Sequence, residues 1–364
     1  MGNNPAHDRS VHRSPRRPPH RSAHPLTGEP LAGLAQWLRA AETGGWSADG
    51  ARALVEQLGR RDRTAGGPSA GDLRLRPVGP SEERYVEKEA YLELAVPVAT
   101  AAPDAASQAR AFRAAKDELA DALGEPSSMG SYGTVGPYHG STPAWGAPFL
   151  RWRGAQDTLE LRAGHHGPEL VLGPTAPIEA WLWSLGHGEE HAISGFLGTR
   201  RCPANTGLSL PGRWTARSWE TATDALTAFF ATLPAECAAL GIAKVLRIYG
   251  RLDGSAPCLF DIDADDRLMV ASYAEDNVDA ASFGWGTVAE HPRSRDTWPD
   301  TSDPRWRLDA GGPGEPPARA LAETVVATAR AEGVAGPEDL LLGSEAQDVG
   351  EYTVTYYGLG LAVV

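Results

Sequence analysis

The segment with the most direct chemical potential is His187-Gly-Glu-Glu-His191, which places two histidines four residues apart. On a helix this spacing brings both imidazoles to one face, where they can bind zinc while the glutamate between them acts as a base. The glycine at its second position weakens a helix, and a third ligand has to come from elsewhere. The motif defines an alternative hypothesis, a zinc-dependent hydrolase that uses His187, Glu190 and His191.

A second group of reactive side chains lies in the stretch Pro257–Tyr273, where apolar and polar residues alternate on both sides of an acidic corner. Such alternation predicts a β-hairpin whose turn, at Ala264–Asp266, carries carboxylates. Asp261, Asp263 and Asp265 have the spacing of a calcium loop. The sixth position lacks the required glycine and the twelfth lacks the bidentate glutamate, so the sequence excludes an EF-hand.

The acidic run continues past the hairpin and ends at an aromatic patch, Phe283-Gly-Trp-Gly286. Exposed tryptophan beside carboxylates is typical of a surface that binds another protein. The alternatives are a solvated strand edge for the carboxylates and core packing for the tryptophan. The predicted partner-binding residues are Asp261, Asp263, Asp265, Asp266, Glu275, Asp276, Asp279 and Trp285.

The remaining candidates for chemistry are weaker. The pair His165-His166 falls in a predicted turn, and Cys202 follows two arginines that would lower its pKa, with no histidine in a recognisable arrangement beside it. The sequence holds no phosphate-binding loop and no dinucleotide-binding glycine motif at a helix start. We therefore predict neither a cofactor nor a resident metal.

Charge favours a protein partner over nucleic acid. The formal net charge is −13, and residues 1–24 contribute +4 through five arginines and one aspartate, which leaves −17 on the rest. A body this acidic repels a phosphate backbone and attracts basic proteins, although the same charge also serves solubility. No apolar stretch is long enough to cross a membrane, and three cysteines without a paired motif are typical of a reducing cytoplasm.

The pattern of elements predicts an α+β fold. Helical periodicity, alternation and turn residues indicate helix, antiparallel strands and helix in each half of the chain. We expect a polar, arginine-rich tail that does not order, because it lacks apolar residues to bury. The predicted organisation is a disordered tail at 1–28, one α+β domain at 29–186, a linker at 187–213 and a second α+β domain at 214–364.

Several predicted local features can be tested directly. Asp104 and Ser218 are expected to begin helices, Gly124 to end one, and Gly59 to end an earlier one. Pro234 is expected to kink or break the second-domain helix. The Gly/Ser/Pro-rich segment 127–148 is predicted to be a long loop that is either mobile or a binding surface.

Part of the first half resembles a known group of proteins. The run Phe149-Leu-Arg-Trp-Arg-Gly154, followed by Asp157-Thr-Leu-Glu-Leu-Arg162 and Glu169-Leu-Val-Leu172, is similar to uncharacterised actinobacterial proteins grouped with immunity proteins of polymorphic toxin systems. The preceding helix end, Ala122-Leu-Gly-Glu-Pro126, fits the same likeness, which covers residues 30–185. The resemblance implies a cytosolic, non-enzymatic inhibitor that occupies a toxin's active site, and the family has no catalytic residues to carry over.

From these observations the expected function is specific, non-enzymatic binding of another protein, such as a basic toxin domain, through the acidic hairpin. The zinc-dependent hydrolase is one alternative. A regulatory or scaffold protein without a toxin is the other.

Overall fold

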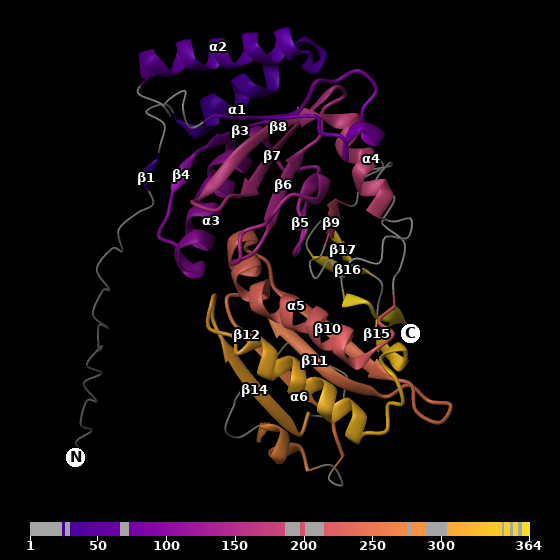
Figure 1. Cartoon of the computed structure of the whole chain (residues 1–364). Helices are drawn as coiled ribbons and strands as arrows, with labels where there is room; N and C mark the ends of the chain where they lie inside the picture. The colour runs from indigo at the N-terminus through magenta and orange to yellow at the C-terminus, as the bar shows by residue number, and fades with distance from the viewer. Residues whose placement is uncertain are drawn as a thin grey trace, which may run out of the picture.

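The computed structural model describes residues 24–25, 30–65, 73–185, 197–200, 215–275, 279–287, 304–343, 346–349, 352–355 and 359–364. Within these ranges the chain forms six α-helices, a nine-stranded sheet and a seven-stranded sheet. All strand pairs in the two sheets are antiparallel except the pair of β15 and β18. The predicted α+β class is confirmed, and Figure 1 shows the two sheets in separate parts of the molecule with helices against each.

The larger sheet is built mainly from the first half of the chain. Alternate side chains of its central strands, such as Leu159 and Leu161, are buried in the main core with residues of α1 and α3. Its strands in spatial order are β16 (Ala346–Val349), β17 (Tyr352–Thr355), β9 (Leu197–Arg200), β5 (Ser128–Ser131), β6 (Pro148–Trp152), β7 (Asp157–Ala163), β8 (Pro168–Pro174), β3 (Tyr91–Pro97) and β2 (Arg74–Pro77).

The smaller sheet is built from the second half of the chain and contains the predicted acidic hairpin. One of its faces, which carries Ile248, Phe260 and Val270, is buried in the main core with α5 and α6. Its strands in spatial order are β13 (Gly286–Thr287), β14 (Trp306–Gly311), β12 (Leu268–Ser272), β11 (Cys258–Ala264), β10 (Lys244–Gly250), β15 (Leu340–Leu342) and β18 (Ala362–Val363).

Helix α5 joins the two parts. It packs against α3 and the strands β5 and β6 on one side, and against α6, β11 and β12 on the other (Figure 1). Buried residues of both sheets therefore belong to one continuous apolar cluster. The helices are α1 (Leu31–Ala40), α2 (Ala48–Ala65), α3 (Ala105–Leu123), α4 (Thr175–Leu185), α5 (Trp219–Leu240) and α6 (Ala318–Ala331).

Short 3₁₀ turns connect several of these elements. They help to position α4 and the loop between β5 and β6, because both η2 and η3 contact α4. They are η1 (Gly44–Trp46), η2 (Glu83–Tyr85), η3 (Pro137–His139), η5 (Ala280–Phe283) and η6 (Pro337–Asp339).

Three of the predicted helix boundaries are confirmed. Asp104 begins α3, and its carboxylate accepts a hydrogen bond from Ser107 N at 2.8 Å. Ser218 begins α5 in the same way, with Thr221 N donating to its hydroxyl at 3.1 Å. Gly124 ends α3 with a φ of 77°, a backbone conformation that favours glycine.

Two predicted helix ends are wrong, the break at Pro234 and the end at Gly59. Helix α5 does not break at Pro234, because the apolar residues around it, including Leu233 and Cys237, are fully buried between the two sheets. That burial offsets the loss of one backbone hydrogen bond at proline. Helix α2 continues past Gly59 to Ala65, at the modest cost of a glycine inside a helix.

Several short strands lie outside the units to which the sequence assigned them. Strand β9 comes from the predicted linker, and the hairpin β16–β17 comes from the predicted second domain, yet all three extend the first sheet. Residues His24–Pro25 of the predicted tail form β1, which pairs with β4 (Ala99–Thr100). The predicted boundaries do not anticipate these long-range pairings, since strand pairing is not local in sequence.

Candidate functional site

The acidic hairpin forms as predicted, with β11 and β12 paired from Phe260 to Ser272. Asp265 N and Arg267 O close its turn at 3.0 Å. The carboxylates of Asp261 and Asp263 alternate along β11 with apolar side chains that enter the core, so they lie on the face away from α5 and α6. The hairpin therefore presents acidic groups on one sheet face and at the turn.

Two members of the predicted partner-binding set are interior residues, and their predicted surface exposure is wrong. Asp261 is only 2% exposed, accepts a hydrogen bond from the Tyr273 hydroxyl and forms an ion pair with Arg247 at 3.4 Å. Trp285 is 4% exposed, stacks on Phe260 and donates its indole N–H to Thr328 Oγ1 at 2.8 Å. Asp261 therefore stabilises the second sheet, and Trp285 joins that sheet to α6.

The other predicted residues differ in exposure. Asp266, Glu275 and Asp279 are exposed, and Asp263 and Asp265 are half-buried. Asp279 accepts a hydrogen bond from Ser282 N at 3.3 Å and so caps η5. Asp276 lies outside the described residues.

Negative charge is concentrated at the hairpin tip. A hydrogen bond with Asp265, followed by partial burial, raises the pKa of Asp266, because two adjacent carboxyl groups resist simultaneous ionisation. The nearest cation, Arg267, turns its guanidinium toward Asp309, with N–O distances of 2.7 and 2.9 Å. The tip therefore keeps two crowded carboxyls.

The tip forms one wall of an open groove at the seam between the two parts of the molecule. The groove has a volume of about 970 Å³ and an apolar floor that includes Ala109, Ala238 and Ile242. Helix α3 also lines it, with Arg110, Arg113 and Asp117, of which the last two form an ion pair at 3.1 Å. A groove of this size can hold several side chains of an extended segment.

The metal-site hypothesis concerns residues that the structure does not describe, since His187, Glu190 and His191 all lie outside the described ranges, as does Cys202. Within those ranges, no three histidine, cysteine or carboxylate side chains are grouped as a metal site would require. His165 and His166 are exposed in the turn between β7 and β8, as predicted.

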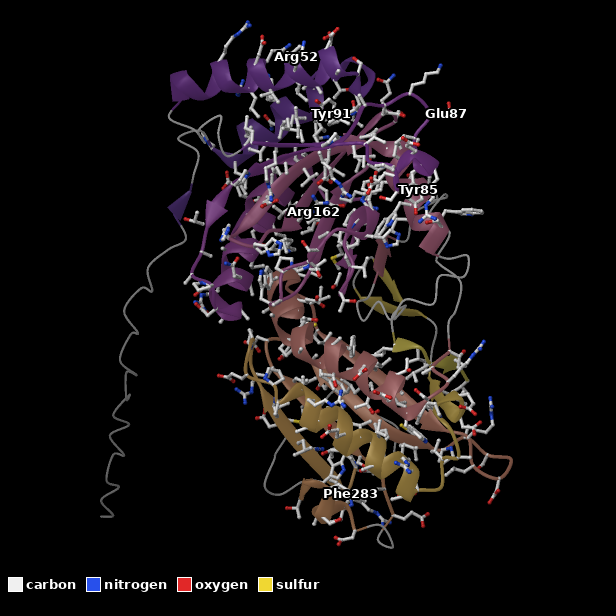
Figure 2. All side chains as sticks on the ribbon, in the orientation of Figure 1. Arg52, Tyr85, Glu87, Tyr91, Arg162 and Phe283 are labelled. Carbon is white, nitrogen blue, oxygen red and sulfur yellow. The ribbon has the colours of Figure 1, made fainter. Side chains whose placement is uncertain are left out.

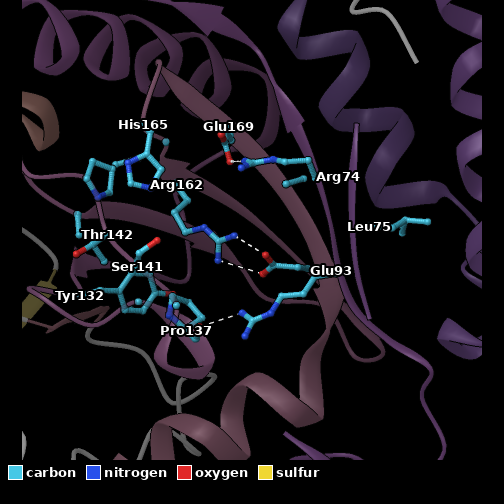
Figure 3. Close-up of a pocket in the computed structure, with 18 residues that line it drawn as sticks. Arg74, Leu75, Glu93, Tyr132, Pro137, Ser141, Thr142, Arg162, His165 and Glu169 are labelled. Carbon is cyan, nitrogen blue, oxygen red and sulfur yellow. Dashed lines mark hydrogen bonds and ion pairs between the residues drawn. The ribbon is translucent and has the colours of Figure 1, made fainter. Parts of the chain in front are cut away.

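A second site, which the sequence did not predict, lies on the face of the first sheet opposite α1 and α3. Side chains from β2, β3, β7 and β8 and from the loop between β5 and β6 surround a cavity of about 260 Å³ (Figure 3). Its polar lining residues are Arg74, Arg76, Glu93, Tyr132, Ser141, Thr142, Arg162, His165 and Glu169. Figure 2 places Arg162 in the first part of the molecule and Phe283 at its opposite end, so this cavity is far from η5.

Ion pairs hold the walls of this cavity. Arg162 donates to both carboxylate oxygens of Glu93, at 2.8 and 3.1 Å, and Arg74 pairs with Glu169 (Figure 3). Burial works to raise the pKa of Glu93, but the charge and hydrogen bonds of Arg162 outweigh it and hold that pKa below its usual value. Both Glu93 and Arg162 are therefore ionised at neutral pH.

Beneath the cavity lies a fully buried triad. Glu160 Oε2 accepts hydrogen bonds from the Tyr132 hydroxyl at 2.6 Å and from Arg151 at 2.9 and 3.1 Å. Burial, reinforced by the charge of Glu160, raises the pKa of Tyr132 well above its usual value. Tyr132 is therefore a neutral hydrogen-bond donor that fixes one wall of the cavity.

The loop that covers the cavity holds an unusual backbone. Tyr138 and His139 are consecutive non-glycine residues with φ of 55° and 60°. Each such residue costs about 1–3 kcal/mol unless its surroundings enforce it. Arg76 does so here, because its guanidinium lies over the Tyr138 ring and donates to the carbonyl oxygens of Pro137 and Tyr138 at 3.2 Å.

The segment 127–148, predicted to be a loop, thus contains β5 and η3 and closes over the charged face of the sheet. Sequence signals for this site exist, because charged residues occupy every second position in Arg74–Arg76 and Glu160–Arg162. Because these positions lie on the face of the sheet opposite the core, their side chains form a charged layer on that face. Which charges meet across the strands depends on register, which the sequence does not show.

No protein-family model, curated protein or solved structure matches this chain in comparisons of sequence and fold. Among the helices that the structure describes, none combines the length and apolar character needed to cross a bilayer. The function therefore has to be argued from the residues themselves.

Proposed function

We propose that this chain is a non-enzymatic protein-binding module that acts in the cytoplasm as an immunity-type inhibitor of a basic toxin domain. The observation that carries this proposal is the pair of crowded carboxyls, Asp265 and Asp266, at the mouth of the groove of about 970 Å³. Two crowded carboxyls repel each other and raise the free energy of the unbound protein. A cationic side chain of a bound partner lowers that free energy by offsetting the repulsion.

The charge of the rest of the chain supports the same kind of partner. A net charge of −13 attracts a cationic protein and speeds its encounter, with a rate that falls as salt increases. Arg110 on α3 then helps to set the orientation, because it repels basic side chains, while the charge of Arg113 is compensated by Asp117. A segment in the groove therefore turns its basic side chains toward the hairpin. Asp263, on β11 two residues before Asp265, extends the acidic surface along the hairpin.

The test starts with a tagged pull-down from the lysate of the producing cell at low and moderate salt, with bound proteins identified by mass spectrometry. We expect one stoichiometric basic partner that dissociates as salt rises. Coexpression with that partner in a sensitive host should then restore growth if the partner is a toxin. A chain that stays alone even at low salt contradicts the proposal.

The groove is tested with the double variant Asp265→Asn/Asp266→Asn against a control of equal charge, Asp49→Asn/Glu56→Gln. Both control residues are exposed on α2, far from the groove (Figure 1). Each exposed ion pair contributes about 0.2–1 kcal/mol, so the groove variant should bind up to about thirtyfold more weakly. Equal affinities of the two variants would mean that net charge, and not the hairpin tip, attracts the partner.

A further inference from the structure

The cavity on the first sheet has the chemistry of a small-anion site. Three guanidinium groups, from Arg74, Arg76 and Arg162, line it together with the hydroxyl of Ser141. The Thr142 hydroxyl also lines the cavity but donates to Gly133 O at 3.0 Å. In Figure 3 the Arg162 side chain lies between the hydroxyl side and the two carboxylates of the cavity. We propose that this cavity binds a small organic oxyanion, a carboxylate or a phosphate, and that Arg162 and Arg74 hold it.

Hydrogen-bond capacity favours an anion over a cation. Each guanidinium has five N–H donors, and among the described residues Arg162 gives two of them to Glu93 while Arg74 gives one to Glu169. Both oxygens of Glu93 already accept from Arg162, and one oxygen of Glu169 accepts from Arg74, so part of the acceptor capacity of the two carboxylates is already used. The guanidinium N–H donors of the cavity exceed its carboxylate acceptors, and an oxyanion supplies the missing acceptor oxygens.

Both arginines are accessible. The Arg162 side chain is 16% exposed and its neighbour Glu93 is similarly enclosed, so Arg162 is fixed in place yet still reaches the cavity. Arg74 is 57% exposed and forms the outer rim. An enclosed inner guanidinium with an exposed outer one lets an anion reach the cavity from solvent and bind between the two.

Stability alone does not account for this arrangement. Replacing buried ion pairs by apolar residues of similar size is often neutral or stabilising. The cavity of about 260 Å³ also far exceeds the roughly 10–15 Å³ that one water molecule requires. The covering loop in addition holds Tyr138 and His139 in a strained backbone, and such strain concentrates at ligand sites.

The test is isothermal titration of the purified full-length protein with inorganic phosphate and, separately, with succinate, in chloride buffer at constant ionic strength. The acidic protein repels anions in general, so saturable binding of either requires a built site. We expect one site with a dissociation constant below about 1 mM for at least one probe. Binding of phosphate alone would identify a phosphorylated ligand, and binding of succinate alone a carboxylic acid. Absence of saturation by both probes at about 10 mM would overturn the proposal.

The assignment to residues uses three variants. Arg74→Gln, at an exposed position, should fold normally and weaken binding at least tenfold, and Arg162→Gln should abolish it. Arg153→Gln is the control, because Arg153 pairs with Glu179 at the surface and does not line the cavity. Equal binding by Arg74→Gln and Arg153→Gln contradicts the site even if Arg162→Gln fails to fold. Affinity of Arg74→Gln for the protein partner should be unchanged, which separates this proposal from the proposed function.

Discussion

Glu236 offers the sharpest test of how the two parts of the molecule are joined. It projects from α5 into the first part, is 0% exposed, and accepts hydrogen bonds from Ser131 Oγ at 2.6 Å and from Ala147 N at 3.0 Å. Gly146 leaves room for it, since a Cβ at that position would lie 2.8 Å from Glu236 Cγ. One carboxyl therefore crosses the seam between the two sheets.

Burial raises the pKa of Glu236 above its ordinary value of 4.5, and hydrogen bonds from Ser131, Ala147 and Thr232 only partly oppose this. Between the unfolded and the folded pKa, the folded protein keeps a proton that the unfolded chain releases. The stability contributed by Glu236 is thus fully present below pH 4.5 and decreases by about 1.4 kcal/mol per pH unit until the folded pKa is reached. Above the folded pKa, the stability lost through Glu236 no longer changes with pH.

Glu236→Gln removes this titration while keeping an oxygen that can accept the hydrogen bonds from Ser131 and Ala147. We therefore expect the variant to gain stability relative to the wild type as the pH rises from 4.5 to 8, measured by urea unfolding at several pH values. Glu220→Gln, an exposed position in the first turn of the same helix, is the control and should show no comparable gain. A difference between Glu236→Gln and wild type that does not change with pH would refute the reasoning.

Three further predictions concern stability and reactivity. Asp104→Ala should destabilise the protein by about 1 kcal/mol at pH 7, because it removes the cap at the start of α3. The cap lowers the pKa of Asp104, so in thermal melts the difference in stability between variant and wild type should shrink as the pH falls below 3.8. Burial, and then the charge of Asp261, raise the pKa of Cys258 to about 12. The alkylation of Cys258 at pH 8 should therefore be roughly a thousandfold slower in the folded protein than in the unfolded chain, as measured by mass spectrometry. Arg151→Met should cost about 3–5 kcal/mol in urea unfolding, because it removes the direct ion pair of the buried Glu160 charge and leaves only the Tyr132 hydroxyl and the Arg162 guanidinium, 4.0 Å away, as its partners. The double variant Arg151→Met/Glu160→Leu should recover most of that loss.

Local features were the most predictable part of the fold. The α+β class, the acidic hairpin and the helix starts at Asp104 and Ser218 follow from short-range patterns, and the structure confirms them. The continuation of α5 through Pro234 was not predictable, because it depends on burial between two sheets that the sequence does not reveal as neighbours. The pairing of the hairpin β16–β17 with the first sheet was not predictable from the sequence for the same reason.

The predicted partner-binding surface was only partly recognisable from sequence. Alternation correctly placed the carboxylates of β11 on one face, but it did not show that Arg247 and Tyr273 enclose Asp261. The glycine-flanked Trp285 was predicted to be exposed, yet Phe260, which lies 25 positions upstream in the chain, stacks on it in the folded protein. Contacts between distant segments decide which polar or aromatic residues reach the surface.

The two proposed sites differ in a way that makes them separable. The hairpin tip concentrates negative charge where solvent and a large partner can reach it, whereas the cavity holds balanced ion pairs on a sheet face under a covering loop. Long-range attraction therefore acts at the tip, and short, directional hydrogen bonds act in the cavity. Raising the salt concentration should weaken partner binding strongly and anion binding in the enclosed cavity much less. If both decline in parallel, the anion is held by surface charge and not by Arg162.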